Sequence, residues 1–223
     1  MDVTLDGVPQ KLYRYDVDDT PENAAVDVPP SSNWAFDHAA DLDAHTKNTF
    51  EVRRTGEYHL SPYVTNRGMT PRAVAANTLY GMPYLITRSE TEDRIACHVT
   101  VQAGQKIRIG IYNTGDNLYP GTLLDDSGEI TLGGVGIQAI NINQALTKGL
   151  YFVAFISDGT PTLNNSEGNV QSPMGAYATG FDSINGRWAV AQAYGALPDP
   201  FTAGAAFDFY PAPAIAFRLL TLD

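Results

Sequence analysis

The sequence has few cysteines, few basic residues and no long apolar run. Cysteine occurs once, at Cys97, so neither an internal disulfide nor a cysteine-based zinc site is available, and we expect the thiol to lie in the core. Lysine and arginine number 14 against 25 aspartates and glutamates, and the formal net charge of −11 repels the phosphates of nucleic acid. No apolar run approaches the ~20 residues of a membrane span. These absences predict a protein made in the cytosol that neither binds nucleic acid nor inserts into a membrane.

The readily recognised catalytic motifs are also missing: the sequence contains no G-x-S-x-G, no G-x-x-x-x-G-K-[ST] and no H-E-x-x-H. Asp125, Asp126 and Glu129 flank a glycine, where aspartate is favoured by local hydrogen bonds, and we interpret them as turn residues and not as the acid pair of a glycosidase. His38 and His45 are two helical turns apart, about 10 Å, so one helix cannot place both on one ion. We therefore expect no enzyme activity, no metal and no cofactor.

The residues that are abundant favour a turn-rich β protein, since the chain has 20 glycines, 14 prolines and 12 tyrosines and is only 17% charged. Residues 93–101 and 106–112 alternate apolar and polar side chains, which predicts two half-buried strands joined as an antiparallel hairpin. Residues 122–132 indicate one or two edge strands around an Asp-Ser-Gly turn. Residues 150–157 are apolar on both faces, which is typical of a central strand. This pattern predicts an all-β fold, an antiparallel β-sandwich of the jelly-roll kind.

The N-terminal part has a different composition. Its first 30 residues mix short apolar pieces with residues 16–30, whose acidic and proline content argues against a packed element, and we expect this segment to be extended or to dock on another surface. Within residues 34–50 the spacing of His38, Leu42 and His45 indicates a short helix. We place a boundary near residue 75, with an attachment and oligomerisation arm over residues 1–75 and the sandwich over residues 76–223. Around a threefold axis the helix would pair its Leu42 stripe with other copies, and three copies of either histidine could meet.

Two predicted loops are candidates for contact with another molecule. Tyr119 lies in residues 113–121, and Asn164 and Asn165 lie in residues 158–169. Loops on a rigid sandwich can vary without disturbing the core, and a tyrosine ring with paired amides suits a sugar. We expect these three residues to contact a host surface glycan or protein; the alternative is that both loops only connect strands. Other aromatic residues that suit sugars and subunit contacts alike are Tyr112, Trp188, Tyr194 and Tyr210.

Several segments succeed one another in an order that resembles virion proteins of tailed bacteriophages, of the tail-fibre and head-fibre type. They are "WAFDHAADLDAHTKNTF", "RTGEYHLSP", "YLITRSETEDRIACHVTV", "IRIGIYNTG", "YPGTLLDDSGEI" and "ALTKGLYFVAFISDG", followed near the C-terminus by "PAIAFRLL". The similarity covers roughly residues 34 to 157. It includes no shared catalytic residues.

The resemblance implies a homotrimeric appendage of the virion, held to other virion proteins by its N-terminal part and displaying a β-sandwich outward for receptor binding. The chain has no repetitive shaft, which leaves a tail, a baseplate and a capsid location open. A capsid head-fibre or decoration protein is therefore one alternative function. A carbohydrate-binding module is an alternative from another class, because it would share the sandwich and the aromatic residues but would need no arm.

Overall fold

The structure is a computed structural model, and it describes residues 2–5, 8–11, 53–61, 69–101, 104–165, 187–208 and 212–222. The chain divides into two compact units, Met1–Thr49 and Phe50–Asp223. In the first unit, β1 (Asp2–Leu5) pairs with β2 (Val8–Lys11) in an antiparallel arrangement. No helix of the described ranges is long and apolar enough to cross a membrane.

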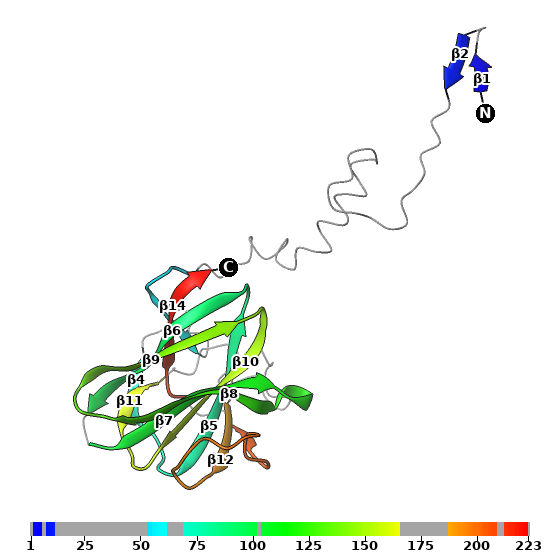
Figure 1. Cartoon of the computed structure of the whole chain (residues 1–223). Helices are drawn as coiled ribbons and strands as arrows, with labels where there is room; N and C mark the ends of the chain where they lie inside the picture. Colours follow the sequence, from blue (N-terminus) through cyan, green and yellow to red (C-terminus); the bar gives the residue numbers. More distant parts are fainter. Residues whose placement is uncertain are drawn as a thin grey trace. The chain divides into compact units, whose positions relative to one another are not determined.

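The second unit is an antiparallel β-sandwich, which confirms the predicted fold class (Figure 1). In spatial order, sheet I consists of β13 (Ala206–Asp208), β12 (Arg187–Ala191), β5 (Thr78–Ile86), β10 (Gly149–Ser157), β7 (Lys106–Thr114) and β8 (Pro120–Thr131). Sheet II consists of β3 (Tyr58–Ser61), β14 (Ile215–Leu222), β6 (Glu90–Val101), β11 (Thr162–Asn165) and β4 (Thr70–Ala73), and β9 (Gly136–Leu146) pairs with the other edge of β6.

The sandwich begins earlier than the sequence pattern suggested. Strands β3 and β4 pair with β14 and β11, so they belong to sheet II, and the second unit starts at Phe50 instead of near residue 75. Both strands have only four residues, too short to show a clear alternation. The helix expected around His38, Leu42 and His45 lies outside the described residues.

The main core lies between the two sheets. β10 is the central strand of sheet I, as predicted, and its side chains are buried on both faces. Tyr151, Val153 and Phe155 point into the main core, which also holds Cys97 as expected. Phe152, Ala154 and Ile156 therefore point to the outer face of sheet I, where they form a second cluster with Leu197 and Phe201. The outer face of sheet I is thus covered by residues of the loop between β12 and β13 (residues 192–205).

The predicted hairpin of residues 93–101 with 106–112 is wrong. The two segments form strands, but β6 belongs to sheet II and pairs with β14, β9 and β11, whereas β7 belongs to sheet I and pairs with β10 and β8. Their apolar faces meet across the main core instead of lying side by side. Alternation identifies the buried face of a strand but does not select its neighbour, because both arrangements bury the same side chains.

Residues 120–131 form one strand, β8, without the predicted turn. The Asp-Ser-Gly segment is a β-bulge: Gly110 pairs with Asp126 and Arg108 with Glu129, so β8 has an extra residue there. Gly128 takes a positive φ of 79°, and the Ser127 hydroxyl accepts a hydrogen bond from the Ile109 N–H at 3.2 Å. Glycine and serine here serve a bulge and not a chain reversal.

A buried ionic cluster attaches the start of the second unit to the sandwich. Arg53 forms an ion pair with Glu90, donates to the Tyr84 hydroxyl at 2.8 Å and to the Leu85 carbonyl at 2.9 Å, and lies over the Tyr84 ring. The Tyr84 hydroxyl donates to Glu92 Oε1 at 2.8 Å. Two carboxyl groups on β6 thus share one guanidinium in a site where Arg53 is only 7% exposed and both glutamates are buried. Burial raises the pKa of Glu92, against the opposing effects of Tyr84 and Arg53.

This cluster predicts that part of the folding stability decreases as the pH rises. The pKa of Glu92 is raised from 4.5 in the folded state, so the folded protein holds the proton more tightly than the unfolded chain. The contribution is fully present below about pH 4.5 and is lost as the pH rises through the folded pKa. Between pH 4.5 and 8, the urea midpoint of Glu92→Gln should therefore depend less on pH than that of the wild type. The exposed control Glu57→Gln should keep the wild-type pH dependence, and identical curves for all three proteins would contradict this prediction.

Gly110 is a position where any side chain should be costly. A Cβ atom there would lie 2.6 Å from the Asp125 carbonyl oxygen and 2.3 Å from Leu197 Cδ1, and the backbone oxygen cannot move aside easily. We expect Gly110→Ala to lower the free energy of unfolding by about 2–3 kcal/mol, as overpacking does. Gly133 has no atom within 4 Å of the same position, so Gly133→Ala should change it by less than about 0.5 kcal/mol. Equal urea midpoints for both variants would contradict this packing.

Candidate functional site

An aromatic cleft opens on sheet I, lined by Asn117, Leu118, Trp188 and Phe207, with a volume of about 280 Å³. Trp188 and Phe207 come from the neighbouring strands β12 and β13, where they face each other in the register. Their rings are 5.2 Å apart in an edge-to-face arrangement. Both rings are half-buried and Leu118 is 43% exposed, so the cleft presents apolar surface that water reaches.

The opposite wall is a tight turn, the 3-10 helix η2 (Asp116–Leu118). Asn117 and Leu118 both adopt positive φ angles, of 52° and 55°. Gly115 and Tyr119 close the turn through a 2.7 Å bond from the Gly115 N–H to the Tyr119 carbonyl. The left-handed backbone turns the Leu118 carbonyl to the Trp188 indole, whose Nε1–H donates to it at 3.0 Å. The indole N–H is thus used within the protein, and the turn and the ring hold each other in place.

The cleft is supported from behind by further rings. The Tyr119 ring lies 4.9 Å from Trp188 and 5.9 Å from Phe201. The Tyr119 hydroxyl donates to the Thr202 carbonyl at 2.6 Å and accepts from the Ala205 N–H at 2.9 Å. Aromatic pairs in such tilted and edge-on arrangements stabilise one another beyond their area burial. The wall of the cleft is therefore preorganised by contacts that a bound molecule does not have to form.

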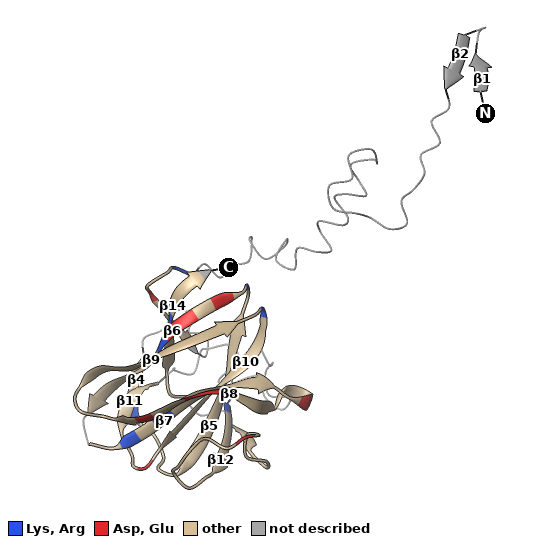
Figure 2. Ribbon diagram, viewed as in Figure 1, with Lys and Arg blue, Asp and Glu red and all other residues tan. Residues whose placement is uncertain are grey.

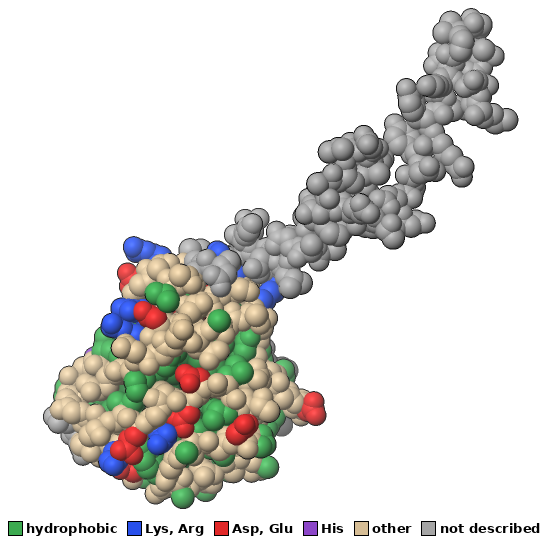
Figure 3. Space-filling model, viewed as in Figure 1, with side chains coloured by type: hydrophobic (Ala, Val, Ile, Leu, Met, Phe, Trp, Pro, Cys, Tyr) green, Lys and Arg blue, Asp and Glu red, His purple; other side chains and the backbone are tan. Residues whose placement is uncertain are grey.

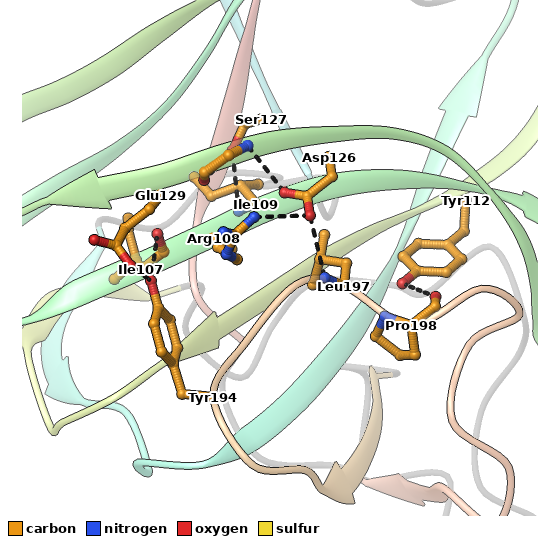
Figure 4. A network of polar contacts seen from close by, with 11 residues as sticks. Ile107, Arg108, Ile109, Tyr112, Asp126, Ser127, Glu129, Tyr194, Leu197 and Pro198 are labelled. Carbon is orange, nitrogen blue, oxygen red and sulfur yellow. Dashed lines mark hydrogen bonds and ion pairs between the residues drawn. The ribbon is translucent and has the colours of Figure 1, made fainter.

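A network of polar contacts fastens the β12–β13 loop to β7 and β8 (Figure 4). Asp126 accepts from Arg108 at 2.9 Å and from the Leu197 N–H at 3.1 Å, so one carboxylate joins both strands to the loop. The Tyr194 hydroxyl donates to Glu129 at 3.3 Å, and burial raises the pKa of Tyr194 to about 12, which keeps the proton on the phenol. The loop that carries Phe201 is thus fixed to sheet I at several points.

The acidic residues of this network act structurally. Asp126 accepts hydrogen bonds from Arg108, the Leu197 N–H and the Gly128 N–H. Glu129 forms an ion pair with Lys106 at 2.7 Å and accepts a hydrogen bond from Tyr194. The Lys106 hydrogen bond lowers the pKa of Glu129, whereas burial and the neighbouring Asp126 raise that of Asp125. Within the described part of the chain, no group of three or more histidine, cysteine, aspartate or glutamate side chains is placed to hold a metal ion.

The structure places the predicted binding residue Tyr119 beside the cleft but not in its lining. Its ring packs behind Trp188, and its hydroxyl is used as donor and acceptor by the β12–β13 loop. Tyr119 therefore positions the aromatic wall. The contribution of Trp188 was visible in the sequence only as one aromatic residue among several, since its partner Leu118 is 70 residues away along the chain.

Asn164 and Asn165 lie in strand β11, and their expected position in a long loop is wrong. Asn165 is only 2% exposed, and its amide donates to the carbonyls of Arg72 at 3.2 Å and Leu163 at 2.9 Å. Asn164 lines a separate hollow of about 220 Å³ on sheet II, together with residues such as His98 and Ala216. The structure therefore does not bring the two asparagines to Tyr119.

Comparison with known proteins gives no relative: no protein-family model, no curated protein and no solved structure matches this chain. The half-buried Trp188 ring, the Phe207 ring inclined to it at 63° and the amide of the exposed Asn117 form a surface that combines stacking with hydrogen bonding. Such a surface can bind a flat molecule with one apolar and one polar side.

Proposed function

We propose that this protein is a non-enzymatic receptor-binding protein whose β-sandwich holds a host surface glycan in the aromatic cleft of Asn117, Leu118, Trp188 and Phe207. The observation that carries the proposal is the preorganised Trp188 ring, fixed through its indole N–H while its half-exposed face borders the cleft. A pyranose ring has an apolar face that stacks on such a ring. Its hydroxyls match the donor and acceptor of the Asn117 amide.

Charge favours a neutral glycan over an acidic one. The chain has a formal net charge of −11, and the exposed Asp116 is adjacent to Asn117 in the turn that forms one wall. None of the four lining residues is charged, so no cation of the lining would pair with a carboxylate or sulfate of the ligand. An acidic sugar would therefore meet repulsion without compensation.

We place this binding function on the surface of a tailed-phage virion, as an appendage such as a tail fibre. What supports this setting is the succession of sequence segments from residue 34 to 157 and the division of the chain into two units. In this proposal residues before Phe50 attach the protein to other virion proteins, and the sandwich is displayed outward. A capsid head-fibre or decoration protein would use the same two parts.

A carbohydrate-binding module is the second candidate. The observation that favours it is that the four described residues that line the cleft all lie in the unit Phe50–Asp223. The two candidates differ in whether the first 49 residues are needed for incorporation into a particle. A protein truncated before Phe50 that binds glycan but is not incorporated supports the virion appendage.

The test of the binding function is a screen of the full chain on an array of neutral and acidic bacterial surface oligosaccharides. We expect binding to neutral members and none to their sulfated or carboxylated counterparts. The same neutral oligosaccharides should compete with adsorption of the protein to host cells. Absence of binding to every neutral glycan, or preference for acidic ones, would contradict the proposal.

A further inference from the structure

Strand β9, an edge of sheet II among the described strands, carries no charged residue, whereas β8 at the edge of sheet I carries Asp125, Asp126 and Glu129. β8 is the last strand of sheet I, and β9, which follows it in the chain, pairs only with β6 among the described strands. β9 is eleven residues long, GIQAININQAL, without a charged residue or a proline. In Figure 2 this strand is tan along its length, whereas β6 beside it carries acidic residues.

Long, uncharged edge strands are rare on monomers because their unpaired N–H and C=O groups can form backbone hydrogen bonds with a strand of another chain. The usual protections are charged side chains, proline, short length or a bulge. β9 has a register shift against β6 opposite Glu92 and Arg94, but its side chains alternate without a break from Gly136 to Leu146. The strand therefore keeps the extended form that pairing requires.

The side chains of β9 that point toward the core are incompletely covered. Ile140 and Ile142 pack against the main core but are only partly buried, in contrast to the fully buried Ile109 and Ile111 of β7. On the other face of β9, Ile137 is 60% exposed. Figure 3 shows hydrophobic side chains on this side of the molecule. Apolar surface beside an open strand edge is typical of a contact between subunits.

We propose that two copies of this chain pair through β9, antiparallel and in register about Asn141, so that the two sheets II join into one sheet. The sequence of β9 is self-complementary in this register. Asn141 lies opposite its own copy, Ile140 opposite Ile142, and Gln138 opposite Gln144. Each pair lies on one face, and no like charges meet. An isologous contact of this kind closes around a two-fold axis.

This symmetry differs from the threefold association expected for the helix around Leu42. The two-fold arrangement follows from the pairing of β9 with its own copy, because antiparallel self-pairing relates the two copies by a two-fold axis. A self-pair of β9 satisfies the edge of sheet II in both copies at once.

The decisive variants place charges at the self-paired position of the full chain. In Asn141→Lys, two lysines face each other across the axis, and in Asn141→Asp, two aspartates do. Light scattering at micromolar concentration should give a dimer for the wild type. For each variant the dissociation constant of the dimer should rise about tenfold or more. An equimolar mixture of the two variants should form dimers again, because lysine then faces aspartate.

Two controls separate pairing from folding. Thr221→Lys adds the same charge at an exposed position of β14, across β6 from β9, and should stay dimeric with an unchanged melting temperature. Asn141→Cys should give a covalent dimer on oxidation, since directly opposed residues are within disulfide reach and the native Cys97 is buried. Thr221→Cys should not. A monomeric or trimeric wild type, a dimer that tolerates both charged variants, or a mixture that stays monomeric would overturn the proposal.

Discussion

Trp188→Ala should abolish most glycan binding while the sandwich stays folded. The ring forms one wall of the cleft, and removal of such a central aromatic anchor costs about 2 kcal/mol, or about thirtyfold in Kd. Trp188→Phe keeps a ring but loses the indole N–H that donates to the Leu118 carbonyl, so it should weaken binding by a smaller factor. Titration calorimetry with the neutral oligosaccharides bound by the wild type measures both effects.

The controls for this prediction remove apolar surface without removing the stacking ring. Val101→Ala changes an exposed hydrophobic residue of sheet II and should bind as the wild type does. Leu118→Gly removes the opposite wall at a position with a φ of 55°, which glycine adopts without strain, so binding should fall several-fold without loss of stability. Full binding by Trp188→Ala with an unchanged melting temperature would contradict the assignment of the cleft.

Arg53→Ala should produce the largest loss of stability among single substitutions near the start of the sandwich. Its guanidinium is bonded to Glu90, Tyr84 and the Leu85 carbonyl in a buried site. Removing one partner leaves a buried carboxylate uncompensated, which costs about 3–5 kcal/mol. Urea denaturation monitored by circular dichroism measures the free energy of unfolding.

The neighbouring Arg54 provides a matched control, because it has the same side chain and is exposed. Arg54→Ala should change the free energy of unfolding by less than about 0.5 kcal/mol. A double variant that also replaces Glu92 by glutamine should recover part of the loss caused by Arg53→Ala, since it removes one of the two carboxyl charges. Equal stability of Arg53→Ala and Arg54→Ala would mean that the buried cluster does not form.

The sequence was sufficient to predict the sandwich and the buried faces of β6, β7 and β10. Period-2 alternation at Ile95, Cys97 and Val99 follows directly from burial of one strand face, and the two-sided burial of β10 follows from its continuous apolar run. The partner strands of β6 and of β7 were not predictable in this way. Hydrophobic pattern specifies which side of a strand is buried, whereas the partner depends on how the whole chain crosses between the sheets.

The candidate site was predicted only in part, because its residues come together through long-range contacts. The sequence correctly placed Tyr119 in the loop beside the cleft. The hydrogen bonds of its hydroxyl, however, join it to residues 83 and 86 positions away, and because of them Tyr119 supports the wall instead of lining it. The burial of Asn165 depends in the same way on its bond to the Arg72 carbonyl, 93 residues earlier. Local sequence carries no signal of either contact.

The central claim, that Trp188 contacts a neutral glycan, can be tested most directly by tryptophan fluorescence. The chain has two tryptophans, so Trp34→Phe leaves Trp188 as the only reporter. Titration of this variant with a neutral oligosaccharide from the array should give a saturable change in emission, and the same Kd as calorimetry. Binding by calorimetry without any change in Trp188 emission would place the glycan elsewhere on the protein and contradict the proposed site.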